Sequence, residues 1–135
     1  MSVEPTSIAI DLSADIPAYR QIVDALRTHL VSGQLAPNDT LPPVRQLAAD
    51  LGVHFNTVAE AYRILAEEGW LELRRRTGAR VLDRQAPAKP PLQQKKAFLR
   101  RLNEIAAEAL SQGISAEEIE TGLRLVADGL RRGGG

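Results

Sequence analysis

Cysteine is absent from the sequence, which excludes disulfide bonds and thiolate metal ligands. A chain without disulfides is typical of the cytosol, so a cytoplasmic location is expected. No apolar run approaches the length of a membrane span or of the apolar region of a signal peptide, so we expect no membrane partner. The 17 basic and 17 acidic residues cancel. This balance argues against a protein that binds polyanions over its whole surface.

The sequence also lacks the groups from which an active site is built. Its two histidines, His29 and His54, fall in separate predicted helices, and there is no cysteine to act with either of them. The acidic pairs at 67–68 and 117–118 fall at predicted helix ends, where carboxylates are solvated or cap the helix. Neither of the common glycine-rich phosphate-binding motifs occurs. We therefore expect no enzymatic activity, no metal site and no cofactor.

The most informative stretch is residues 41–69, where two apolar stripes at helical spacing flank a glycine. Gly52 permits a sharp turn between the two stripes, and Gly69 is placed to end the second helix. The pattern predicts a helix-turn-helix. Its buried positions are Val44, Leu47, Ala48, Leu51, Val58, Ala61, Tyr62 and Leu65.

The exposed face at the start of the second helix carries few long charged side chains and several groups that form hydrogen bonds. Such a helix suits the major groove of DNA, which is roughly 12 Å wide. Two short apolar runs then flank a polar turn at 74–78, which predicts a small β-hairpin, or wing. The turn contains Arg74, Arg75 and Arg76, and these arginines are suited to a phosphate backbone. The predicted fold is mainly α with a small β wing, a winged helix-turn-helix.

The sequence LPPVRQLAADLGVHFNTVAEAYRILAEEGWLELRRRTGARVL resembles the DNA-binding domain of the GntR family. The usual form of that domain is LPSER-x-LA-x-x-LGVSR-x-TV-x-x-A-x-x-x-L-x-x-x-G, followed by a wing that ends in G-x-G-T-x-V. The spacing matches across residues 41–81 without a gap. The segment 56–62 is more similar to the short YtrA-like branch of the family than to the FadR-like branch. The frequent capping serine, two recognition-helix arginines and first wing glycine are replaced by Pro43, Phe55, Ala59 and Arg76.

The resemblance implies a transcriptional regulator, and we expect a repressor that binds a two-fold DNA operator as a homodimer. Asn56 is the first candidate for reading a base, because its amide can bond an adenine edge in two places. Phe55 and Ala59 are candidates for contact with thymine methyl groups, and His54 is a further candidate base reader. The expected phosphate and minor-groove contacts are Thr57, Arg45, Arg75, Arg76, Thr77 and Gly78.

The N-terminal part predicts one further amphipathic helix. Ile8, Ile10 and Leu12 alternate with polar or small residues, which indicates a short strand. Asp15 before Pro17 is typical of a helix start, because a carboxylate can cap the first turn and proline suits that turn. The apolar face of the helix consists of Tyr19, Ile22, Val23, Leu26 and Leu30.

A proline-rich stretch separates the winged domain from a second apolar pattern. The predicted parts are a DNA-binding domain over 1–84, a linker over 85–94 and a helical hairpin for dimerisation over 95–132. Ser115 and Glu118 form a capping box for the second helix of this hairpin. The two helices carry apolar seams with the same spacing, Phe98, Leu102, Ile105 and Ala109 in one and Ile119, Leu123, Val126 and Leu130 in the other.

Such a hairpin alone buries too little apolar surface to be stable. We expect it to pair with a second copy, because helix-turn-helix proteins bind paired half-sites as dimers. YtrA-like regulators, which the chain resembles, also dimerise through a short helical C-terminal segment. A hairpin that covers the winged domain of its own chain would hide the same apolar surface.

The sequence is also compatible with roles that involve no reading of DNA. In this alternative, Arg45 forms an ion pair with Asp50 or Glu67 and makes no phosphate contact. The whole chain can be a protein-protein interaction module that uses the winged fold without sequence-specific DNA reading, and the arginines at 74–76 then have no special purpose. The expected partners are double-stranded operator DNA and a second copy of the chain. A small-molecule effector stays unknown, because the C-terminal helices show no convergent polar pocket.

Overall fold

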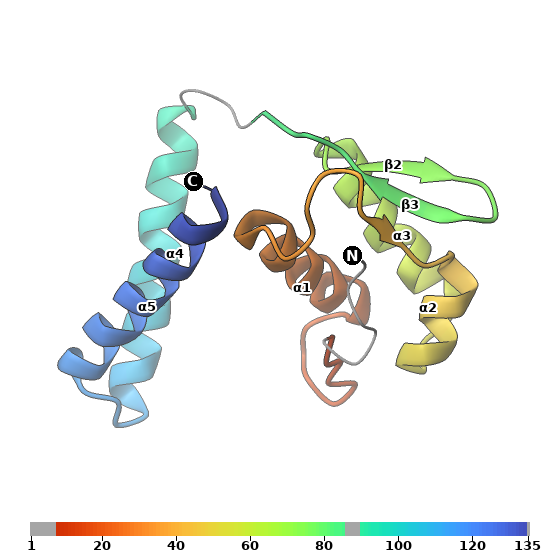
Figure 1. Cartoon of the computed structure of the whole chain (residues 1–135). Helices are drawn as coiled ribbons and strands as arrows, with labels where there is room; N and C mark the ends of the chain where they lie inside the picture. The colour runs from red at the N-terminus through yellow and green to blue at the C-terminus, as the bar shows by residue number, and fades with distance from the viewer. Residues whose placement is uncertain (1–7, 86–89, 135) are drawn as a thin grey trace. The chain divides into compact units, whose positions relative to one another are not determined.

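The computed structural model describes residues 8–85 and 90–134 of the chain. The chain divides into two compact units, of which the second spans Gln85–Arg131. The predicted fold class, mainly α with a small β wing, is confirmed (Figure 1). The elements are α1 (Ala18–Ser32), β1 (Thr40–Leu41), α2 (Val44–Leu51), α3 (Phe55–Glu67), β2 (Leu71–Arg74), β3 (Gly78–Val81), α4 (Leu92–Ser111) and α5 (Ala116–Gly134).

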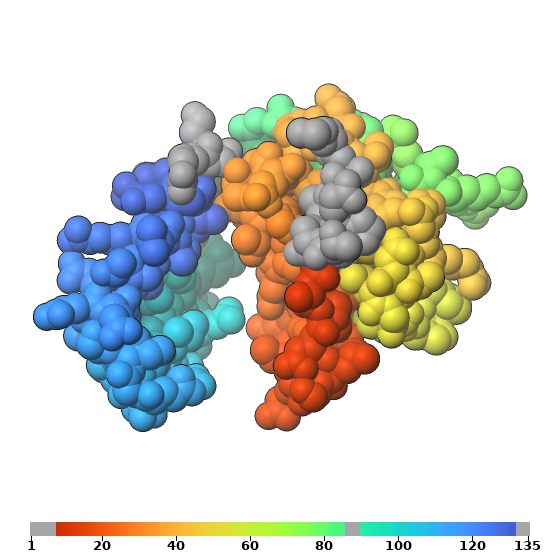
Figure 2. Space-filling view, turned by 60° about the horizontal axis from the view of Figure 1, so that its bottom comes forward, coloured from red at the N-terminus to blue at the C-terminus, as the bar shows by residue number. Residues whose placement is uncertain are grey.

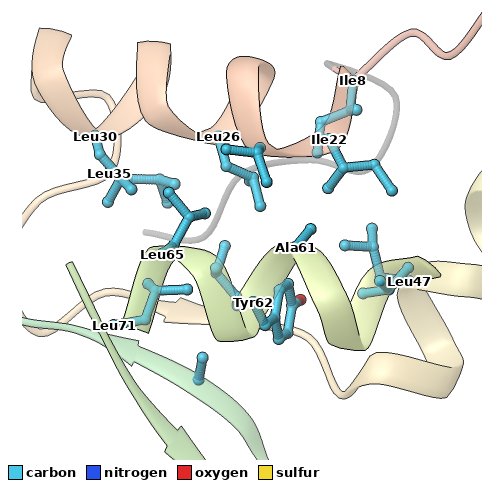
Figure 3. Packing of buried hydrophobic residues seen from close by; sticks show 14 of the residues in the cluster. Ile8, Ile22, Leu26, Leu30, Leu35, Leu47, Ala61, Tyr62, Leu65 and Leu71 are labelled. Carbon is cyan, nitrogen blue, oxygen red and sulfur yellow. The ribbon is translucent and has the colours of Figure 1, made fainter. Parts of the chain in front are cut away.

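The core of the first unit lies around α3. Figure 3 shows α3 between α1 and the strands, with Ile22 and Leu26 of α1 pointing toward it. The predicted stripes of α2 and α3 are confirmed, since Leu47, Ala48, Val58, Ala61, Tyr62 and Leu65 are buried and Val44 and Leu51 are partly buried. Because one face of α3 is used for this packing, its opposite face is left for solvent or a partner.

The turn between α2 and α3 has the tight geometry that the sequence predicts. Gly52 ends α2 with a φ of 72°, in the left-handed region where a side chain is strained. The N–H of Val53 donates to the carbonyl oxygen of Ala48 at 3.0 Å, which closes the end of α2. This turn fixes the angle at which α3 leaves the core.

The three strands form an antiparallel sheet in the order β1-β3-β2. Leu71 pairs with Val81 and Arg74 pairs with Gly78, so residues 75–77 form the turn of the wing. A Cβ added to Gly78 would lie 2.0 Å from the carbonyl oxygen of Leu41, and Gly78 has a φ of 90°. The absence of a side chain at Gly78 therefore lets the wing pair with β1. Figures 1 and 2 show the wing projecting from the first unit.

Two predictions for the N-terminal segment are wrong. No strand forms over residues 8–12, because Asp11 pairs its backbone with the side chain of Gln21, at 2.8 Å and 2.9 Å, in place of a strand edge. Ile8 nevertheless docks on the core and is only 6% exposed. Asp15 does not cap α1, since Pro17 is the capping residue and no side chain bonds the first turn. The carboxylate of Asp11 bonds Ser13 instead.

The second unit is a helical hairpin. α4 begins at Leu92, three residues before the predicted boundary, because Pro91 already occupies the capping position. Residues 86–89 of the predicted linker lie outside the described residues. The predicted capping box is confirmed in part: Ser115 Oγ accepts the N–H of Glu118 at 3.1 Å, whereas the Glu118 carboxylate accepts the Ser115 hydroxyl, also at 3.1 Å, and not its backbone N–H. None of the helices in the described part of the chain is long and apolar enough to cross a membrane.

Candidate nucleic-acid interface

The N-terminal end of α3 is capped by a histidine. His54 Nδ1 accepts the backbone N–H of Asn56 at 3.1 Å, and the N–H of Thr57 donates to the His54 carbonyl oxygen at 3.0 Å. The His54 and Asn56 side chains are exposed, whereas Thr57 and Ala59 are half-buried. The first turn of α3 therefore presents an imidazole and an amide to the outside, on an element fixed by the core.

Arg45 lies against an aromatic ring and forms no ion pair with any residue that the structure describes. Its guanidinium carbon lies 4.2 Å from the centroid of the Phe55 ring. The His54 ring stacks with Phe55 at 4.4 Å between centroids. The side chain of Glu67 is already bound by Arg63 at 2.6 Å. The structure therefore contradicts the interpretation in which Arg45 only pairs with Asp50 or Glu67.

A groove of about 550 Å³ runs between α3 and the wing. We call it the wing groove. It receives one arginine from α2, one from β2 and one from the turn of the wing, so three cations converge on it. The lining residues are Pro43, Val44, Arg45, Ala59, Tyr62, Leu73, Arg74, Arg76 and Gly78.

Tyr62 forms the floor of the wing groove and belongs to the core. Its hydroxyl donates to the carbonyl oxygen of Pro42 at 2.8 Å, which ties α3 to the segment between β1 and α2. Burial raises the pKa of the Tyr62 phenol, so the neutral hydroxyl donor is the form present in ordinary buffers. Tyr62 therefore positions the two helices relative to each other.

The acidic residues of the first unit neutralise some arginines and leave others free. Glu60 and Glu67 both bind Arg63, at 2.5 Å and 2.6 Å. Glu72 binds Arg80 and Arg74, and these two arginines hold the pKa of the Glu72 carboxyl below its usual value. The remaining two arginines of the wing turn, at 75 and 76, form no ion pair within the described residues. The turn of the wing therefore carries two arginines without a carboxylate partner among the described residues.

The wing turn is strained at one residue. Arg76 has a φ of 68°, and it occupies the position where the GntR form has its first wing glycine. A residue with a Cβ pays for this left-handed conformation, whereas glycine does not. Thr77 is exposed beside it. Gly78 is buried against β1, where the absence of a side chain permits the close approach of the two strands. Only its backbone is therefore available for contact.

Comparison with known proteins identifies the family to which this geometry belongs. Residues 18–81 match the family model described as bacterial regulatory proteins, gntR family. The structure of YtrA from Sulfolobus acidocaldarius, a GntR-family transcription factor, is 32% identical and superposes with a TM-score of 0.55, covering 74% of this chain and 98% of that one. The chain belongs to the GntR family. Its similarity to YtrA extends beyond the winged domain into the helical hairpin.

Two curated relatives illustrate the range of GntR proteins that share this domain. The transcriptional repressor YtrA of Bacillus subtilis is 28% identical over 128 residues, which cover 93% of this chain and 96% of YtrA. The vitamin B6 salvage pathway transcriptional repressor PtsJ of Salmonella typhimurium is 40% identical over 67 residues. These residues are 50% of this chain but only 16% of PtsJ, so that likeness is confined to the winged domain.

The second unit of this GntR chain leaves its apolar seams largely uncovered. No side chain of α4 is fully buried. Phe98, Ile105 and Val126 are 62%, 61% and 61% exposed. Leu123 and Leu130 are also exposed, whereas Leu102, Ala109 and Ile119 are half-buried in the hairpin. Further apolar residues of the hairpin are exposed beside these seams, namely Leu92, Leu99, Leu110, Ile114 and Leu125.

Sequence analysis did not identify the residues that hold the C-terminal end of α3. Arg27 of α1 binds the Glu68 carboxylate at 2.5 Å and 3.1 Å. Arg84 Nε donates to the Glu68 carbonyl oxygen at 2.8 Å, and its guanidinium lies 4.6 Å from the Trp70 ring centroid. The partners of Glu68 are 41 and 16 residues away in sequence, so no local pattern signals them.

Proposed function

We propose that this chain is a transcriptional regulator that binds a two-fold DNA operator as a homodimer and represses transcription. The observation that carries the proposal is the wing groove, in which Arg45 of α2 and Arg76 of the wing turn, neither of them bound by a described carboxylate, flank the exposed face of α3. A winged helix of this form places one helix in the major groove and its wing along the adjacent backbone.

The distribution of charge supports DNA binding by a few local contacts. Residues 1–85 contain 9 Lys and Arg against 11 Asp and Glu, so the winged domain as a whole is slightly acidic. Arg45, Arg75 and Arg76 are nevertheless free of carboxylate partners among the described residues. Each cation that neutralises a phosphate releases a counterion, so binding by these few arginines depends strongly on salt.

The exposed seams of the hairpin support the homodimer. A helix pair with side chains such as Phe98 and Ile105 in water lacks a core of its own, and pairing with a second copy covers this surface. Two linked winged domains then bind two half-sites with opposite orientation. The repressor role rests on the relatives, since YtrA and PtsJ are both described as transcriptional repressors.

Selection of bound DNA from a random pool by the full chain tests this function. We expect an enriched sequence with two inverted half-sites whose centres lie about one helical turn, or a multiple of it, apart. Sedimentation of the free protein should show a dimer. A pool that yields no enriched sequence, with a folded and dimeric protein, contradicts the proposal and favours a protein-protein interaction module.

A further inference from the structure

Two side chains, those of Arg45 and His54, lie against the Phe55 ring at the start of α3. The Arg45 guanidinium carbon lies 4.2 Å from the Phe55 ring centroid, and the His54 ring lies 4.4 Å from that centroid with 29° between the planes. The usual GntR form has serine and arginine at the positions of His54 and Phe55. This chain has therefore replaced a small cap and a flexible cation by two stacked rings.

The cap bond determines which nitrogen of His54 carries the proton. Since the N–H of Asn56 donates to Nδ1, the proton of the neutral ring lies on Nε2. A half-turn of the ring would place a carbon where Nδ1 now accepts, so the cap opposes this rotation, and the Phe55 stack restricts it further. Among the described residues, Nε2 has no acceptor. The Nε2–H of His54 is therefore a hydrogen-bond donor without a protein acceptor among the described residues, at the exposed N-terminal end of α3.

We propose that His54 is a specificity-determining residue, whose Nε2–H donates to an acceptor on the major-groove edge of a base while Nδ1 caps α3. This inference rests on the proposed function. Purine N7, guanine O6 and thymine O4 are acceptors of this kind, whereas the cytosine amino group is a donor and is rejected. Phe55 is a positioning residue for the His54 ring, because the two rings stack, and Arg45 packs in turn on Phe55.

The two functions of His54 can be separated by substitution. Serine caps a helix well but cannot reach as far as an imidazole, so His54→Ser keeps the cap and removes the Nε2 donor. Alanine removes both. Binding is measured on a panel of single-base variants of the sequence that the wild-type protein selects. Thermal unfolding of each protein is measured beside it.

We expect His54→Ser to unfold at the wild-type temperature but to lose roughly five- to hundredfold discrimination at one base pair in each half-site, which is the usual range for one mismatched position. His54→Ala should lose the same discrimination and also unfold at a lower temperature. Phe55→Leu should weaken discrimination at that same base pair, because the ring is no longer held. His29→Ser, at the other histidine of the chain and outside the wing groove, is the control that should leave the panel unchanged.

Three outcomes overturn the inference. If His54→Ser keeps full discrimination, His54 acts only as a cap. If His54→Ser weakens all panel members equally, the ring contacts the backbone and reads no base. If the wild-type protein selects no sequence, the proposed function fails and the inference fails with it, a result distinct from the other two.

Discussion

Replacement of Arg76 by glycine should make the wing more stable and the protein a weaker DNA binder. Arg76 has a φ of 68° at the tip of the wing, where glycine is unstrained. It also lines the wing groove and has no carboxylate partner within the described residues. Stability and binding are therefore expected to change in opposite senses, which a purely structural role cannot produce.

The size of both effects follows from the geometry. The left-handed conformation costs a residue with a Cβ about 1–2 kcal/mol. The greater freedom of the unfolded chain with glycine offsets about 0.4–1 kcal/mol of this, so the net gain lies between about 0 and 1.6 kcal/mol, with a middle value of about 0.8 kcal/mol. For a domain of this size such a gain raises the Tm by about 2 to 8 °C. Loss of one phosphate contact per protomer lowers the magnitude of the salt slope by about 0.9, or about 1.8 for a dimer.

Two assays and two matched variants isolate these effects. Thermal unfolding is followed by fluorescence of Trp70, the single tryptophan of the chain, which lies in the first unit. Operator titrations at several salt concentrations give the slope. Arg76→Ala should lower the slope equally but without the gain in Tm, because alanine keeps the strain. Arg124→Ala, at an exposed i,i+4 pair in α5, should leave the salt slope unchanged.

Two results would refute this reasoning. A lower Tm for Arg76→Gly would show that the positive φ carries no cost here, or that the arginine side chain supports the wing. An unchanged salt slope in both Arg76 variants would show that the wing tip does not meet a phosphate.

Three further predictions concern the base reader, the wing and the dimer. Asn56→Ala should weaken the free energy of operator binding by about 1–3 kcal/mol, through the loss of one base contact per half-site. If binding instead falls equally over a panel of operator variants, Asn56 contacts the DNA backbone. Gly78→Ala should disrupt the wing, because the added Cβ would lie 2.0 Å from the Leu41 carbonyl oxygen. An unchanged circular dichroism spectrum together with a wild-type-like melting curve would disprove this. Leu102→Asp combined with Leu123→Asp should give a monomer in sedimentation and lower operator affinity by roughly 10²–10⁴, whereas a persistent dimer would move the interface elsewhere.

The helix-turn-helix could be predicted from sequence because its determinants are local. The stripes of α2 and α3 repeat within each helix, and Gly52 marks the turn between them. β1 could not be predicted, since it contains two residues and forms only because β3 lies beside it. For the same reason, the close approach of Gly78 to Leu41 is visible only in the folded chain.

The parts of the candidate site that depend on side-chain contacts were also beyond sequence analysis. The exposed positions at the start of α3 follow from helical periodicity, which gives the direction of a side chain but not its partner. The stack of Arg45 on Phe55 joins two helices across the turn, and the His54 cap replaces the small residues that ordinarily cap helices. The predicted strand at residues 8–12 failed because Gln21 supplied the backbone partners that a strand edge would have provided.

The distribution of paired and free arginines has a consequence for how such a protein finds its target in a cell. A genome offers about 10⁶–10⁹ competing sites, and attraction to them comes almost wholly from phosphate contacts. In the described part of the first unit, Glu60, Glu67 and Glu72 hold Arg63, Arg74 and Arg80 in ion pairs. We expect residence on random DNA to be short, so that more of the protein stays free in solution. Occupancy of the operator then depends on contacts made by α3, and a small loss of base reading should release the site.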